Sequence, residues 1–284
     1  MTASRTTRST PVDHPPVPGT ALWVLAHPRP ESLNGHLFRA GTEALAEQRS
    51  VATSDLYAQG FDPVLGEQDL GRSADRPGNL AQLAGEAYRE GRAETAVRAE
   101  HGKLARSELL VLQFPLWWYG TPAILKGWLD RTLTDSFAYD AELDPVDGMP
   151  RRYGDGGLTR RTALIVVTVG EDERTLGPRG VSGDLDSLLF PLTHGALWYV
   201  GIQALELHVV HDADGLDAAG AARETHRLRE RIAALSTEQV RPFRRLRDGE
   251  YPSDLRALHP ELLPGRTDLD IHRHSDPVRA DLRA

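Results

Sequence analysis

Three aromatic residues stand in a row directly after an apolar segment, at Trp117, Trp118 and Tyr119. Only 6% of the chain is aromatic, so this clustering is informative. Backbone groups of such a loop can hydrogen-bond the edge of a heterocycle while the ring of Trp118 or Tyr119 flanks its plane. The alternative is a structural role in the core or in an interface between subunits. Since successive side chains of an extended segment point to opposite sides, we expect one of the two tryptophans to be structural.

A second loop, from His27 to Asn34, leads into a segment with helical periodicity. The N-terminus of a helix offers free backbone N–H groups and the positive end of the helix dipole, which favour an anion such as phosphate. Ser32 and Asn34 can add side-chain hydrogen bonds, and His27 can donate another. The loop has neither the P-loop nor the dinucleotide glycine pattern. A simpler role stays open, in which Ser32 or Asn34 only caps the helix.

Several other kinds of site are excluded or disfavoured. The chain has no cysteine, which removes disulfides, thiolate nucleophiles and cysteine-based metal sites. His208 and His211 lie three apart on an expected strand and face opposite sides, so no metal site is expected. No G-x-S-x-G sequence marks a hydrolase nucleophile. The formal net charge of −8 argues against a nucleic-acid partner.

The two ends of the chain differ in composition from its middle. Residues 1–19 are rich in Ser, Thr, Pro and Arg and lack the apolar region of a secretory signal, so a flexible arm is expected. Residues 20–240 form the expected domain, and residues 241–284, rich in Arg, Pro and Asp, an extension. No apolar run has the length that a bilayer requires. We therefore expect a cytoplasmic protein that is not embedded in a membrane.

Within the domain, short apolar segments that indicate strands alternate with helical segments. The expected strands are Ala21–Ala26, Val51–Leu56, Leu109–Phe114, Thr162–Val169 and Gln203–Val210. The expected helices cover Asn34–Ala46, Leu80–Ala105, Ala123–Thr132, Asp184–Tyr199 and Asp217–Leu235. This alternation predicts an α/β fold in which helices cover both faces of a parallel sheet.

Five such strands fit the flavodoxin-like doubly wound order, 2-1-3-4-5. In that order a ligand binds outside the carboxyl ends of strands 1 and 3, where the winding reverses. The loops after Ala26 and after Phe114 are therefore predicted to form one site. Thr168 and Gly170, at the end of the fourth strand, lie next to it and can reach the pyrimidine side of a flavin.

The segment QFPLWWYGTPAILKGWLDR, Gln113–Arg131, followed by Phe137-Ala138-Tyr139, closely resembles the NAD(P)H:quinone oxidoreductases of the flavodoxin-like superfamily. This family includes the DT-diaphorases and their bacterial relatives. The similarity extends back to Val24–Gly35 and Ser54–Leu65 and forward to Arg179–Pro191, so that it covers residues 21 to 235.

The resemblance implies an NAD(P)H dehydrogenase (quinone)-type flavoprotein, in which a hydride passes from NAD(P)H through the flavin to a quinone or a similar small acceptor by a ping-pong scheme. It implies FAD, with FMN as the alternative, and a homodimer with shared active sites. The residues implied to hold the flavin are His27, Ser32, Leu33, Asn34, Pro115, Leu116, Trp117, Trp118, Tyr119, Thr168 and Gly170. The implied acceptor pocket consists of Trp118, Tyr119 and Tyr139.

Two catalytic positions depart from the family pattern. The diaphorases have a Tyr and a His after the fourth strand that stabilise charge on the reduced flavin, and these positions are Leu176 and Ser182 here. Charge stabilisation then has to come from backbone N–H groups, from a residue such as Arg174 or Arg179, or from water. The catalytic residues are therefore unknown from the sequence.

Two further departures affect the loop and the pocket. The paired glycines of the family are Gly170-Glu171 here, and the second tyrosine of the acceptor pocket is Ala141. These substitutions resemble the bacterial branch more than the mammalian one. They leave open an alternative function, a flavin- and nucleotide-binding regulatory subunit of a potassium-efflux-type transporter. A one-electron carrier of flavodoxin type is disfavoured by the length of the chain.

Overall fold

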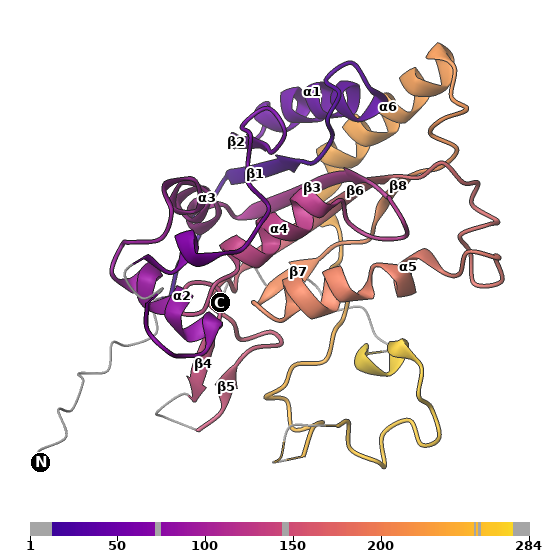
Figure 1. The fold of residues 1–284 in the computed structure, drawn as a ribbon. Helices are drawn as coiled ribbons and strands as arrows, with labels where there is room; N and C mark the ends of the chain where they lie inside the picture. The colour runs from indigo at the N-terminus through magenta and orange to yellow at the C-terminus, as the bar shows by residue number, and fades with distance from the viewer. Residues whose placement is uncertain (1–12, 72–74, 144–147, 253, 255–256, 275–284) are drawn as a thin grey trace, which may run out of the picture.

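A twisted parallel sheet forms the centre of the protein (Figure 1). The computed structural model describes residues 13–71, 75–143, 148–252, 254 and 257–274. The strands of the sheet are β1 (Thr20–Leu25), β2 (Ser50–Asp55), β3 (Leu109–Pro115), β6 (Arg161–Thr168), β7 (Ile202–Ala204) and β8 (His208–Val210). They pair in the order β2-β1-β3-β6-β7, with β8 also beside β6, and every pairing is parallel. The predicted doubly wound order is confirmed.

Helices cover both faces of this sheet, as predicted. On one face, α1 (Leu33–Ala46) and α6 (Ala218–Ala234) pack on a cluster that includes Trp23, Val111 and Leu164. On the other face, α3 (Thr95–Arg106) and α4 (Ala123–Thr132) pack on the alternate residues of the same strands. Strands buried on both sides explain why the sequence shows continuous apolar runs rather than alternation.

Two expected elements are divided in the structure. The long helix expected over Leu80–Ala105 is α2 (Leu80–Arg89) followed by α3, because Gly91 adopts a φ of +64° that ends the first helix. The strand expected over Gln203–Val210 is β7 and β8, separated by a segment in which Leu205 bridges to Val240. Both expectations were wrong because tertiary contacts and backbone conformation interrupt an apolar pattern that is continuous in the sequence.

The helix expected over Asp184–Tyr199 is also divided. It consists of α5 (Leu185–Leu188) and a π-helical segment, η3 (Pro191–Trp198). Pro191 lacks the N–H that would continue the hydrogen bonding of α5, which accounts for the break. The remaining elements are short, and the antiparallel β4–β5 pair among them was not expected: η1 (Glu67–Asp69), β4 (Asp140–Leu143), β5 (Pro150–Arg151), η4 (Leu235–Thr237) and η5 (Leu269–His272).

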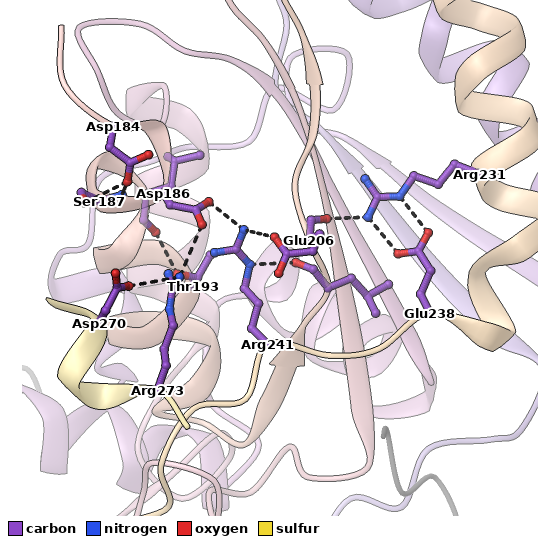
Figure 2. A network of polar contacts seen from close by, with 12 residues as sticks. Asp184, Asp186, Ser187, Thr193, Glu206, Arg231, Glu238, Arg241, Asp270 and Arg273 are labelled. Carbon is purple, nitrogen blue, oxygen red and sulfur yellow. Dashed lines mark hydrogen bonds and ion pairs between the residues drawn. The ribbon is translucent and has the colours of Figure 1, made fainter. Parts of the chain in front are cut away.

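The C-terminal extension packs on the domain rather than standing apart from it. Arg241 is 2% exposed, and its Nη2 lies 2.7 Å from Asp186 Oδ1 and 2.8 Å from Glu206 Oε2. Figure 2 shows Arg241 between these two carboxylates. Trp198 Nε1 donates to the carbonyl oxygen of Arg244 at 3.0 Å. Residues 241–246 thus join the core, while the boundary at residue 240 stays a prediction.

The described end of the N-terminal arm also contacts the domain. The His14 ring lies 4.8 Å from that of Phe137, between ring centroids, and its Nε2 is 3.2 Å from the Tyr88 hydroxyl. Residues 1–12, for which flexibility was expected, lie outside the described residues. Among the helices that are described, none combines the length and apolar character needed to cross a membrane.

Candidate functional site

The fold brings together the two loops that the topology singled out. The His27 loop follows β1, the aromatic loop follows β3, and these strands are neighbours in the sheet. The rings of His27 and Trp117 lie 6.2 Å apart between centroids. The carboxyl ends of parallel strands meet at one edge, so this proximity follows from the strand order.

In the first loop, Ser32 is the N-cap of α1. Its Oγ accepts the Gly35 N–H at 3.2 Å and lies 2.9 Å from His27 Nδ1. Partial burial lowers the pKa of the His27 imidazole, which favours its neutral form. No acceptor within the described part of the chain meets the N–H groups of Leu33 and Asn34. The capping interpretation holds for Ser32, and two backbone donors remain for an anion.

The side chain of Asn34, by contrast, is buried and hydrogen-bonded within the protein. Asn34 is 4% exposed, and its Nδ2 donates to Thr168 Oγ1 at 2.8 Å. Gln113 Nε2 donates to the Asn34 carbonyl oxygen at 2.7 Å, and Trp23 Nε1 donates to Gln113 Oε1 at 2.9 Å. This buried chain of hydrogen bonds fixes the start of α1 against β1, β3 and β6, so Asn34 positions the loop.

The aromatic loop is not extended. Trp118 and Tyr119 have φ angles of +50° and +59°, and the Gly120 N–H donates to the Trp117 carbonyl oxygen at 3.1 Å. Left-handed backbone of this kind costs about 1–3 kcal/mol per non-glycine residue and tends to occur at functional sites. Because the chain reverses, strand alternation does not apply. Trp117 is 42% and Trp118 96% exposed, so neither lies in the core of the chain, and a structural role for one of them in an interface between subunits stays a prediction.

Behind this loop lies a pocket of about 360 Å³, here called the switch-point pocket. Its size falls within the ~300–1,000 Å³ typical of small-molecule sites. It is lined by Pro115, Leu116, Trp117, Trp118, Tyr119, Thr168, Val169, Gly170, Glu171, Leu176, Ala213 and Asp214. Seven of the predicted flavin-binding residues are in this set.

Ala213 and Asp214 were missed by the sequence reasoning. They follow β8, and Ala213 N–H donates to the Val169 carbonyl oxygen at 2.9 Å. The signal was available, because the carboxyl end of the fifth predicted strand must lie at the same edge of the sheet as the others.

The pocket is acidic. Glu171 and Asp214 line it, and none of the lining residues is Lys, Arg or His. Arg174, suggested as a source of positive charge, is 91% exposed in its side chain and pairs with Asp172 at 2.7 Å. Arg179 is exposed and does not line the pocket either. Neither arginine therefore replaces the family's Tyr and His.

The positions of that Tyr and His have different surroundings. Leu176 is buried and forms part of the pocket wall. Ser182 Oγ lies 3.2 Å from the Tyr119 hydroxyl, which donates to Glu171 Oε1 at 2.9 Å. A polar contact between the aromatic loop and the loop after β6 thus stands at the edge of the pocket.

The predicted acceptor residues are divided between two cavities. Tyr119 and Tyr139 line a groove of about 510 Å³ between α4 and η3, here called the α4–η3 groove, whereas Trp118 lines only the switch-point pocket. Burial raises the pKa of the Tyr139 hydroxyl to about 12. Ala141 lies in β4, and its side chain is outside the described part of the structure. No cluster of three potential metal ligands occurs among the described residues.

The fold and the position of this pocket define a flavodoxin-like protein, and the family comparison agrees. The model of the flavodoxin-like fold family matches residues 20–232. A ribosyldihydronicotinamide dehydrogenase-like protein of Penicillium crustosum is 35% identical over 84% of this chain and 89% of its own length. NAD(P)H dehydrogenase [quinone] 1 of Cavia porcellus is 36% identical over 66% of each chain. The chain belongs to the NAD(P)H:quinone oxidoreductase family of the flavodoxin-like superfamily.

A bacterial relative of known structure extends this likeness. It is a Klebsiella pneumoniae protein provisionally assigned as a quinone reductase, 34% identical, with a TM-score of 0.83 over 90% of this chain and 99% of its own. This match is in keeping with the expected similarity to bacterial members.

Proposed function

We propose that this protein is a flavin-dependent NAD(P)H oxidoreductase that reduces a quinone or a similar small acceptor by transfer of two electrons as a hydride. The observation that carries the proposal is the switch-point pocket, where an exposed indole, left-handed backbone and unpaired amides meet at the carboxyl edge of the sheet. The family to which the chain belongs supports the same function. Nothing in the contacts described above favours a transporter subunit.

The residues of the pocket fit a flavin. In the described chain, the N–H groups of Trp118, Tyr119 and Gly170 meet no acceptor, so they are free to bind the polar edge of a heterocycle. Gly170 allows the Asp214 carboxylate to approach the backbone closely, since a Cβ at this position would lie 2.9 Å from Asp214 Oδ2. The Thr168 hydroxyl accepts from Asn34 and keeps its own proton for a ligand.

The cofactor proposed is FAD, with its pyrophosphate at the α1 N-terminus and its isoalloxazine in the switch-point pocket. His27, Ser32 and the free amides of Leu33 and Asn34 hold the phosphates. Bound there, FAD would supply the chemistry of hydride transfer between NAD(P)H and the acceptor. The chain binds and orients these groups and excludes water.

A homodimer is proposed because apolar side chains lie uncovered beside the pocket. Trp118 and Val181 are 96% and 95% exposed, and the α4–η3 groove is largely apolar. A second copy covering these residues would complete the acceptor site, with Tyr139 contributing to it. Sedimentation of the holoprotein is expected to give twice the chain mass of 31.3 kDa.

The decisive test is identification of the cofactor. The purified protein is expected to be yellow, to release FAD on heating, as determined by mass, and to bleach on addition of NADH or NADPH without oxygen. Release of FMN would correct the cofactor and keep the function. A colourless protein that takes up neither FAD nor FMN would overturn the proposal.

A further inference from the structure

A three-residue hydrogen-bonded group links the two loops that border the switch-point pocket. The Tyr119 hydroxyl donates to Glu171 Oε1 at 2.9 Å and lies 3.2 Å from Ser182 Oγ. Tyr119 comes from the loop after β3, and the other two come from the loop after β6. The group therefore spans the pocket edge, and Tyr119 faces both the switch-point pocket and the α4–η3 groove.

The Glu171 carboxyl has an uncommitted oxygen. Its Oε2 is buried and has no hydrogen-bond partner among the described residues, although Glu171 lines the pocket. An unpartnered buried carboxylate oxygen is costly, and that cost disappears when the oxygen holds a proton or meets a donor. Leu176, on the pocket wall, has no proton to give. Side-chain proton donors at this edge are thus the Tyr119 and Ser182 hydroxyls.

The reaction proposed above needs such a donor. A quinone that gains a hydride has gained two electrons and one hydrogen, and one further proton is required to form the neutral hydroquinone. The family supplies a Tyr and a His near the flavin, and this chain has Leu176 and Ser182 at those positions. If this chain reduces quinones without that Tyr and His, another group has to supply the proton.

We propose that Tyr119 is the proton donor to the acceptor and that Glu171 and Ser182 position it. This inference rests on the proposed function. As the hydride adds to the quinone, the Tyr119 O–H bond breaks and an O–H bond forms on the acceptor oxygen. The tyrosinate accepts a hydrogen bond from the Ser182 hydroxyl and regains its proton from water, to which Tyr119 is accessible.

The left-handed conformation of Tyr119 is consistent with this role. A φ of +59° is maintained against its conformational cost, and it directs the phenol toward the loop after β6 instead of along the strand. At 43% exposure, the residue is accessible to a small acceptor and to solvent. Ser182 stands at the position of the family's catalytic histidine. Its Oγ lies within hydrogen-bond distance of the Tyr119 hydroxyl, the group proposed here as the proton donor.

The test compares an acceptor that needs a proton with one that does not. In Y119F, reduction of a benzoquinone is expected to slow at least tenfold, because general acid catalysis contributes about 10²–10⁴-fold and water replaces part of it. Reduction of ferricyanide, which takes electrons alone, is expected to slow less than reduction of the benzoquinone. The solvent deuterium isotope effect on the quinone step should fall toward one.

The second variant, E171Q, retains an oxygen that can accept from Tyr119 and loses the carboxylate that holds the phenol through a charge-assisted hydrogen bond. It is expected to slow quinone reduction by about three- to tenfold and ferricyanide reduction by less, by the same general-acid reasoning. Y57F is the matched control, since Tyr57 is an exposed tyrosine away from both pockets. If Y119F does not retain its flavin, the comparison of quinone and ferricyanide reduction in E171Q tests the inference instead.

The outcomes separate this inference from the function on which it rests. If wild type binds flavin and reduces quinone while Y119F and E171Q reduce both acceptors at wild-type rates, Tyr119 is not the donor and the function stands. Equal slowing with quinone and ferricyanide would assign the group a structural role and also overturn the inference. Absence of flavin in the wild type removes the proposed function itself.

Discussion

The segment Gln113–Arg131 contains two regions that place the same kinds of side chain in opposite environments. In the aromatic loop, Trp118 is almost fully exposed and the backbone is left-handed. In α4, which begins three residues after the loop ends at Gly120, Trp128 is fully buried and the backbone is regular. The loop leaves the backbone N–H groups of Trp118 and Tyr119 without an acceptor among the described residues, whereas the buried polar side chains of α4 have partners.

The contacts of α4 are with carboxylates from other segments. Trp128 Nε1 donates to Glu100 Oε2 at 2.9 Å. Arg131, also fully buried, binds Asp69 through Nε at 3.0 Å and Nη2 at 2.8 Å. The two acids come from α3 and η1, so α4 fixes distant parts of the chain to the sheet. The segment Gln113–Arg131 thus combines a loop that borders the pocket with a helix that packs against the core. Its resemblance to a family does not by itself tell these two roles apart.

The largest effect is expected from Arg131→Leu. Removing the guanidinium leaves Asp69, which is 4% exposed, without its cation. Breaking a buried ion pair in this way costs about 3–5 kcal/mol. Urea unfolding of the apoprotein would measure the loss. Lys126→Ala is the control on the same helix: its pair with Asp130 is exposed, and about 0–1 kcal/mol is expected. Equal losses of unfolding free energy in the two variants would contradict the expectation that the buried ion pair contributes more than the exposed one.

Trp128→Phe is expected to be the next most destabilising change. It retains most of the apolar volume and removes the indole N–H that serves buried Glu100, a loss of about 1–3 kcal/mol. Flavin affinity should change little once the variant is folded. A large loss of flavin affinity at unchanged stability would mean that α4 takes part in flavin binding.

Trp118→Ala should show the reverse behaviour. Its side chain is solvent-exposed in the chain alone, so the unfolding free energy is expected to stay within about 0.5 kcal/mol of wild type. Flavin binding is expected to weaken about tenfold, which corresponds to about 1.4 kcal/mol of lost stacking. Fluorescence titration of the apoprotein with FAD measures this. Unchanged affinity and activity would show that the isoalloxazine lies elsewhere.

The smallest predicted effect concerns pH and the end of α4. His101 Nε2 lies 2.9 Å from the Thr132 carbonyl oxygen, and burial lowers the pKa of this imidazole from 6.5 to about 4. The folded state therefore binds fewer protons than the unfolded state between these values. The stability from neutral His101 is present above pH 6.5 and is lost as the pH falls toward 4.

His101→Gln, which can still donate to Thr132, is expected to lessen the fall in urea midpoint between pH 6.5 and 4. His36→Gln, at an exposed histidine, serves as the control. An identical pH profile in His101→Gln and wild type would exclude His101 as a contributor to acid destabilisation.

Much of the fold followed from the sequence because its signals are local. The apolar runs that became β1, β3 and β6, the match of Ala123–Thr132 to α4 and the strand order all rest on periodicity and connection rules. The same rules placed the His27 loop beside the aromatic loop. The interruptions at Gly91, Pro191 and Leu205 were not predicted, because an apolar pattern continues across them.

The sequence by itself determined the family, the sheet order and the location of a ligand site at one edge. Only the tertiary structure decided which side chains face that site. It committed Asn34 to the interior through Thr168, exposed both tryptophans, and joined Tyr119 to Glu171 and Ser182. The physical reason is that strand order depends on patterns repeated over many residues, whereas the direction of one side chain depends on a few backbone angles and on neighbours distant in the chain.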